Sequence, residues 1–184
     1  MQNIKLHILK NSVIALAMTL FFACKNNLDD VKKMGMSAND PVGVSDSINV
    51  KYTDSGRLAA NLVSPKMYDF SNRAFSYSEF PEGVVLHLYD KNRAKTTIIS
   101  DYAILYDNTN LIDLRGHVIA ATSTNDTLFA EQLYYDQSKQ WLFTNLPATY
   151  RAKGYVTSGM GFDSDRDFKK AEVLGVTGQF AVQE

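Results

Sequence analysis

Few side chains of this sequence could perform chemistry, and those few are far apart. Beyond residues 1–23 there are two histidines, His87 and His117, each in a segment predicted to be a strand. Histidine binds metals and exchanges protons near neutral pH. Neither residue has a second histidine or a cysteine at the spacing of a metal site, so we interpret both as ordinary strand histidines.

Three aspartates recur along the chain, Asp107, Asp136 and Asp163. Carboxylate oxygens are suitable calcium ligands, so one interpretation is a carboxylate cluster or a calcium site. However, each aspartate opens a polar segment, and aspartate in such a position bonds its own backbone. Turn chemistry is therefore the favoured interpretation.

The glycine-rich segment Ser158-Gly159-Met160-Gly161 is neither a nucleophile elbow nor a phosphate loop. Its glycines indicate a bulge or a close backbone approach. Trp141 and the pair Tyr134-Tyr135 could stack on a sugar, but as members of the repeat described next they favour a core or a groove lining. None of these residues indicates an enzyme, and no cofactor or metal is expected.

A spacing pattern that occurs four times indicates the elements that carry these residues. It reads apolar, small or polar, apolar, usually Asp, and then a large apolar residue. The copies begin 37, 29 and 27 residues apart, which is long enough for a hairpin and its turn. They are Leu62-Ser64-Met67-Phe70-Phe75, Ile99-Asp101-Ile104-Asp107-Ile112, Leu128-Ala130-Leu133-Asp136-Trp141 and Tyr155-Thr157-Met160-Asp163-Phe168.

Regular turn signals from Ile48 onward predict an all-β domain, either a sandwich or an open roll. Turns are expected at segments such as Asp54-Ser55-Gly56, Arg115-Gly116 and Asp163-Ser164-Asp165-Arg166. No helix longer than two turns is expected.

The N-terminal segment is typical of a secreted lipoprotein. Lys5 and Lys10 precede an apolar stretch that is too short for the roughly 20 residues of a membrane-spanning helix and ends at Cys24, the only cysteine. We predict a signal peptide over residues 1–23 and lipidation of Cys24; an uncleaved anchor or an incidental cysteine are the alternatives. Polar residues predict a flexible tether over 24–46 and a domain over 47–184.

The charge of the mature chain excludes one class of partner. Removing Lys5 and Lys10 from 19 basic residues leaves 17 against 20 acidic residues, a net charge of about −3. A nucleic-acid-binding protein is expected to carry a basic surface, so none is expected here.

Several segments together resemble the LptC family of lipopolysaccharide-export proteins, in the version found in Bacteroidetes-like bacteria. The resemblance covers about Ile48 to Phe180, and the order and spacing of its motifs make it specific. The segments are Phe80-Pro81-Glu82-Gly83-Val84, Arg115-Gly116-His117-Val118, Leu128 to Asp136, Gly154, and Gly159 to Asp165.

This resemblance implies an open, twisted β-roll or jellyroll (OstA-like) of antiparallel strands in the periplasm. Its implied partners are lipopolysaccharide, the inner-membrane lipopolysaccharide ABC transporter and a periplasmic LptA-like bridge protein. The resemblance implies a location at the inner membrane. Many family members carry an uncleaved N-terminal helix, whereas this chain is predicted to have a lipoprotein signal, so the mode of anchoring departs from the family. A further departure is the segment from Asp90 to Ala94, which lacks the glycine often found there.

An open roll would present an apolar trough for acyl chains, whose burial is favourable by about 0.8 kcal/mol per CH₂. The alternative is that the same residues form a closed core. Because side chains alternate along a strand, Leu62, Ser64 and Met67 cannot all face inward without a bulge. The predicted lining consists of Leu62, Leu86, Leu88, Ile99, Leu128 and Trp141.

The ends of the roll are predicted to dock other β-rolls. The segment from Val173 to Val182 contains no lysine or proline, the residues that usually protect an edge strand. Val176 and Phe180 are therefore predicted to pair with the downstream protein, and Val50 and Tyr52 to face the transporter. The alternative function is a lipoprotein adaptor of the envelope that binds only proteins.

Overall fold

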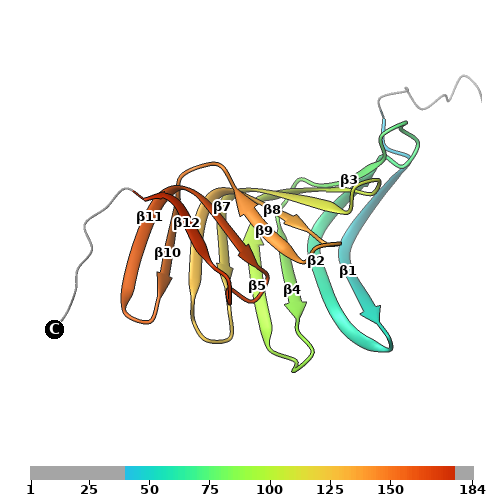
Figure 1. Ribbon diagram of the computed structural model, residues 1–184. Coiled ribbons are helices and arrows are strands. Elements are labelled where there is room, and N and C mark those ends of the chain that lie inside the picture. Colours follow the sequence, from blue (N-terminus) through green and yellow to red (C-terminus); the bar gives the residue numbers. More distant parts are fainter. Residues whose placement is uncertain (1–39, 177–184) are drawn as a thin grey trace, which may run out of the picture. The chain divides into compact units, whose positions relative to one another are not determined.

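The computed structural model describes residues 40–176 (Figure 1). These residues all lie within a single compact unit of the chain. The predictions for residues 1–39, including Cys24 and the signal peptide, lie outside the described residues, as does Phe180. Residues 40–176 form an antiparallel all-β structure, as predicted, and none of these residues belongs to a helix that could cross a membrane.

Residues 40–176 contain twelve strands. They are β1 (Gly43–Asp54), β2 (Arg57–Asp69), β3 (Tyr77–Phe80), β4 (Val84–Tyr89), β5 (Lys95–Ser100), β6 (Tyr102–Tyr106), β7 (Leu111–Ala121), β8 (Thr127–Asp136), β9 (Trp141–Thr144), β10 (Ala148–Ala152), β11 (Tyr155–Asp165) and β12 (Glu172–Val176).

The pairing register divides the sheet into two arms. The first arm has the order β1-β2-β4-β5-β7-β8-β10-β11. The second arm has the order β1-β2-β3-β6-β7-β8-β9-β11-β12. Strands β1, β2, β7, β8 and β11 run through both arms. In Figure 1 the first-arm hairpins β1–β2, β4–β5, β7–β8 and β10–β11 lie side by side along the lower part of the view.

The fourfold repeat corresponds to these first-arm hairpins. Each copy starts in the second strand of a first-arm hairpin, in β2, β5, β8 or β11, and continues into the second arm. In three copies the small or polar residue marks the passage between arms: Ser64, Asp101 and Ala130. The expectation that the spacing between copies is long enough for a hairpin and its turn is therefore confirmed.

Hydrogen bonds at these corners hold the two arms together. The buried hydroxyl of Ser64 donates to the carbonyl oxygen of Gly83 at 2.7 Å. At the next corner His117 lies 2.5 Å from the carboxylate of Asp101. Gly116 has φ +73, and a Cβ there would lie 2.9 Å from that carboxylate, so any other residue would be strained at this position.

Two predicted boundaries are wrong. Arg115-Gly116 is not a turn but a bulge in the continuous strand β7, where the register with β8 shifts between Arg115 and Val118. A glycine with positive φ occurs in bulges as well as in turns, so the sequence signal is the same for both. The turn predicted at Asp163 begins only at Arg166, because β11 pairs with β9 as far as Asp165.

The tether prediction of 24–46 extends too far, because β1 begins at Gly43 and pairs with β2 from there. The amide of Val42 also donates to the carbonyl oxygen of Asp69 at 2.8 Å. The polar residues at the start of β1 are those of an exposed edge strand, which composition alone does not distinguish from a linker.

The core lies between the inward faces of the two arms. The first arm contributes buried residues such as Leu88, Ile98 and Leu128, and the second contributes Leu114, Leu133, Leu142 and Phe162. Alternation along the strands explains this, since in β4 the residues Val84, Leu86 and Leu88 are buried and their neighbours are not.

Candidate lipid-binding interior and docking edges

One apolar row crosses the whole inner face of the first arm. It follows the pairs Leu62–Leu86, Leu86–Ile98, Ile98–Ala120, Ala120–Leu128 and Leu128–Tyr150. Three predicted lining residues, Leu62, Leu86 and Leu128, belong to this row. Leu88 lies on the same face in the neighbouring row, where it pairs with Ala60. The structure thus brings four of the six predicted residues together.

The prediction of a single lining is wrong for Ile99 and Trp141, which face outward. Ile99 is 45% exposed, because its neighbour Ile98 occupies the inner row opposite Leu86. In the sequence repeat Ile99 occupies the same position as Leu62. In the pairing register, however, Ile98 lies in the same row as Leu62. Because side chains alternate along a strand, this offset of one residue places Ile99 on the opposite face of the sheet. In β9 the buried residues are Leu142 and Thr144, while Trp141 donates its indole Nε1–H to the carboxylate of Asp163.

The interior is filled with side chains. Leu62, the least buried of the four inward leucines, is 8% exposed. Side chains of the two arms therefore contact each other, and the closed-core interpretation describes this conformation. Acyl chains could occupy the interior only by taking the place of contacts between the arms.

An aromatic cluster joins the arms at the β10–β11 end of the interior. Tyr150 of the first arm lies 5.5 Å from Phe162 of the second arm, measured between ring centroids. Phe168 packs edge-on against both rings, at 5.7 Å from Tyr150 and 5.4 Å from Phe162. Burial raises the pKa of Tyr150 to about 12, so this phenol stays neutral. The β10–β11 end is therefore closed by packed rings.

The β1 end of the interior is exposed. Val50 and Tyr52 lie on the inner face, opposite Leu62 and Ala60, yet they are 54% and 65% exposed. Within residues 40–176, β1 pairs only with β2, so its other edge has no strand partner. An apolar inner face with an unpaired edge is a surface to which another β-strand can add.

A second unpaired edge lies at the opposite side of the sheet. β12 pairs only with β11 in the described part of the chain, and its last residue, Val176, lies opposite Gly159. A Cβ at Gly159 would lie 2.3 Å from the carbonyl oxygen of Leu174, so glycine allows β12 to approach closely. This confirms a close backbone approach at the Ser158–Gly161 segment.

Three of the residues first considered for chemistry, His87, Asp136 and Asp163, have structural partners. His87 contacts Thr97 at 3.1 Å on the outer face, and desolvation lowers its pKa. Asp136 accepts a hydrogen bond from the amide of Lys139, which lowers the pKa of that carboxyl, as expected for turn chemistry. Asp163 instead binds Trp141. Among residues 40–176 no cluster of three or more His, Cys, Asp or Glu could hold a metal.

The sequence prediction missed a polar network on the outward side of the second arm. Asp113 is 1% exposed and accepts hydrogen bonds from Arg115 at 2.5 Å and from Gln132 at 2.6 Å. Nearby, the hydroxyl of Tyr102 donates to Glu79 at 2.7 Å. Alternation along the strand is the sequence signal that could have revealed part of this network. Asp113 and Arg115 are two residues apart in an apolar strand and therefore share a face.

Taken together, the features of residues 40–176 define a class of protein: a two-armed antiparallel β-roll with an apolar interior and, among these residues, an edge strand without a second strand partner at each end. A family described as "Lipopolysaccharide-assembly, LptC-related" matches residues 12–181, and the chain belongs to this family. No curated protein matches the sequence in a direct search. The family is a non-enzymatic component of lipopolysaccharide transport, periplasmic and associated with the inner membrane.

Proposed function

We propose that this chain is a non-catalytic, lipopolysaccharide-binding segment of a periplasmic bridge. It would receive lipopolysaccharide from the inner-membrane ABC transporter and pass it to an LptA-like β-roll protein. The observation that supports this proposal most directly is the inner row from Leu62 to Leu128, which continues to the exposed Val50 at the edge of the roll.

The inner row offers acyl chains an environment like that of a membrane. Each methylene buried there is favourable by about 0.8 kcal/mol, so a lipid with several acyl chains gains far more than a single contact between the arms. The chains would enter beside Val50 and Tyr52, where the inner face is exposed, and replace contacts that Leu62 and Leu86 make with the second arm. The arms would separate as the lipid advances.

The two unpaired edges would align this interior with those of its neighbours. The β1 edge, with Val50 and Tyr52, would join the transporter side, and the β12 edge, with Val176 and the following Phe180, would join the downstream protein. Main-chain hydrogen bonds supply affinity in such strand addition. Pairing at both edges would give one continuous apolar path, so that acyl chains need not cross water.

Anchoring is the second part of the proposal. Residues 1–23 would be removed as a signal peptide, Cys24 would carry lipid, and the tether would run from Cys24 to about Val42, since β1 begins at Gly43. The inner membrane is the proposed location of the anchor. Mass spectrometry of protein extracted from membranes tests this, and an intact chain from Met1 with unmodified Cys24 would contradict it.

The alternative is a lipoprotein adaptor that binds only proteins, and the filled interior favours it. Purification of the full chain from lipopolysaccharide-producing cells, followed by mass spectrometry of bound lipid, distinguishes the two functions. We expect bound lipopolysaccharide, and we expect purified lipid A to compete with it. Protein that captures the transporter but carries no lipid, and that gains none from added lipid A, would favour the adaptor.

A further inference from the structure

The outward surface of the second arm carries a band of aromatic rings that no inner-face function requires. We propose that this band is a binding site for an oligosaccharide. We call it the outer aromatic face. Its members are Phe75, Tyr77, Tyr102, Tyr106, Tyr134, Trp141 and Phe143, all half-buried or exposed.

The pairing register places five of these rings, all except Phe75 and Tyr102, in two rows that cross the second arm. One row follows the pairs Tyr77–Tyr106, Tyr106–Leu111, Leu111–Asp136 and Asp136–Trp141. In the adjacent row Tyr134 pairs with Phe143, and their rings stack at 5.2 Å. Neighbouring strands of a sheet lie about 4.8 Å apart. A row that crosses several strands is therefore as long as several sugar rings.

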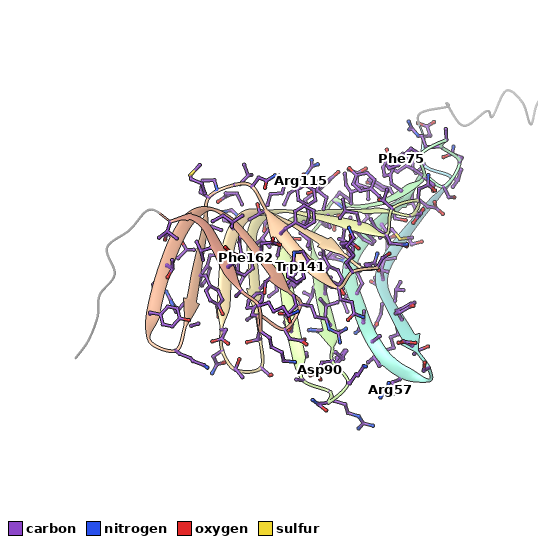
Figure 2. All side chains as sticks on the ribbon, in the orientation of Figure 1. Arg57, Phe75, Asp90, Arg115, Trp141 and Phe162 are labelled. Atoms are coloured by element: carbon purple, nitrogen blue, oxygen red, sulfur yellow. The ribbon has the colours of Figure 1, made fainter. Side chains whose placement is uncertain are left out.

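A surface pocket of about 660 Å³ lies at one end of the outer aromatic face. Its lining includes Phe75, Tyr77, Glu79, Tyr102 and Tyr106. The Phe75 side chain is 50% exposed, and its ring lies 5.5 Å from that of Tyr106. In Figure 2 Phe75 and Arg115 both lie in the upper part of the view, above the turns of the first-arm hairpins. A concave site with aromatic walls and a few polar groups is typical of a ligand pocket.

Polar groups lie between the rings in fixed positions. Buried Asp113 orients Arg115 and Gln132, and Gln132 also donates to the hydroxyl of Tyr134 at 2.8 Å. The carboxylate of Glu79 lies in the pocket and accepts from Tyr102. Sugar rings present apolar C–H faces that pack on aromatic rings, and hydroxyl groups that bond to carboxylates, amides and guanidinium groups.

The charges of this face balance, which favours a ligand without strong charge. The pocket lining contains one cation, Arg73, and one carboxylate, Glu79. Beside the pocket Asp113 is paired with Arg115, and Asp136 with Lys139 at 3.4 Å. Phosphate-rich ligands need basic groups in excess, which this arrangement does not supply. A cationic ligand is also disfavoured, because the guanidinium of Arg115 already lies over the ring of Tyr102 at 5.9 Å. A saccharide fits both constraints.

Two sources could supply such a saccharide: the sugar chain of lipopolysaccharide, or the glycan of the cell wall. The inference does not rest on the proposed function, because the outer aromatic face and the inner row lie on opposite sides of the sheet. Trp141 is the only tryptophan of the chain, so its fluorescence reports on this face.

The test is a titration of the full chain in detergent micelles, monitored by tryptophan fluorescence. One arm uses the lipid-free saccharide released from lipopolysaccharide by mild acid, and the other uses muramidase-digested cell-wall glycan. We expect a saturable change with one of them, and the responding probe identifies the source. Loss of one stacking ring in Phe75→Ala or Tyr106→Leu should weaken that binding about threefold to tenfold.

Tyr155→Ala is the matched control, since Tyr155 is 51% exposed but lies in the first arm. It should bind like the wild-type chain, and circular dichroism should show all three variants folded. If Tyr106→Leu is unfolded, Phe75→Ala alone decides. Absence of a response to both saccharides at about 10 mM would overturn the proposal, as would equal weakening by Tyr155→Ala. Neither result would bear on lipid A binding to the interior.

Discussion

The rings of Tyr150 and Phe162 lie 5.5 Å apart and connect the two arms at the β10–β11 end of the interior. At the β1 end the inner-face residues Val50 and Tyr52 have no such cover. The interior is therefore asymmetric, with an exposed end where lipid would arrive and a packed end from which it would leave. Passage through the roll would require the aromatic cluster of Tyr150, Phe162 and Phe168 to open.

Phe162→Ala should show how much this cluster stabilises the closed arms. Phe162 is fully buried, so truncation should lower the free energy of unfolding by about 3–5 kcal/mol. Val50→Ala, at the exposed end, should cost about 1 kcal/mol or less. Urea unfolding measures both, and similar losses for the two variants would contradict the asymmetry.

Gly159→Ala should loosen β12. The added Cβ would lie 2.3 Å from the carbonyl oxygen of Leu174, which forces the strands apart and costs about 1–3 kcal/mol. Gly43→Ala is the control, because its Cβ meets no atom closer than 3.5 Å. Hydrogen exchange should accelerate at the amides of Val173 and Leu174 in Gly159→Ala only. Unchanged exchange there would show that the close approach is not required.

The pH dependence of the corner should follow His117. Its hydrogen bond to Asp101 raises the pKa of the imidazole, with Glu131 adding to the effect. A folded pKa above the unfolded one stabilises the fold at low pH, and this contribution disappears as the pH rises through the folded pKa. In Asp101→Asn the pKa of His117 should fall towards its ordinary value. An NMR titration of the His117 ring measures this, and equal pKa values in both proteins would contradict it.

Val176→Pro tests the downstream edge. Proline removes a backbone donor at the end of β12, and capture of the downstream β-roll protein should be lost while the domain stays folded. Val176→Ala keeps the donor and should capture the partner at wild-type levels. If folded Val176→Pro protein, as judged by circular dichroism, still captures its partner normally, this edge is not the docking site.

The sequence predicted the all-β class, the repeating hairpins and most turns, because alternation and turn residues are local signals. It did not predict the face of Ile99, since the repeat and the pairing register differ by one residue there. The sequence also did not distinguish the bulge at Gly116 from a turn, because this distinction depends on the pairing of the segment with strand β8. The network around Asp113 depends on Gln132 of another strand, which one-dimensional spacing does not reveal.

Residue-by-residue photo-crosslinking along β4 and β5 tests the central claim most directly. Crosslinkers at Leu86, Leu88 and Ile98 face the interior and should capture lipopolysaccharide in cells, while those at His87 and Ile99 face outward and should not. This alternation, with Ile98 labelled and Ile99 not, is the result that a lipid-filled interior predicts. Equal labelling at all five positions, or labelling only at His87 and Ile99, would contradict it.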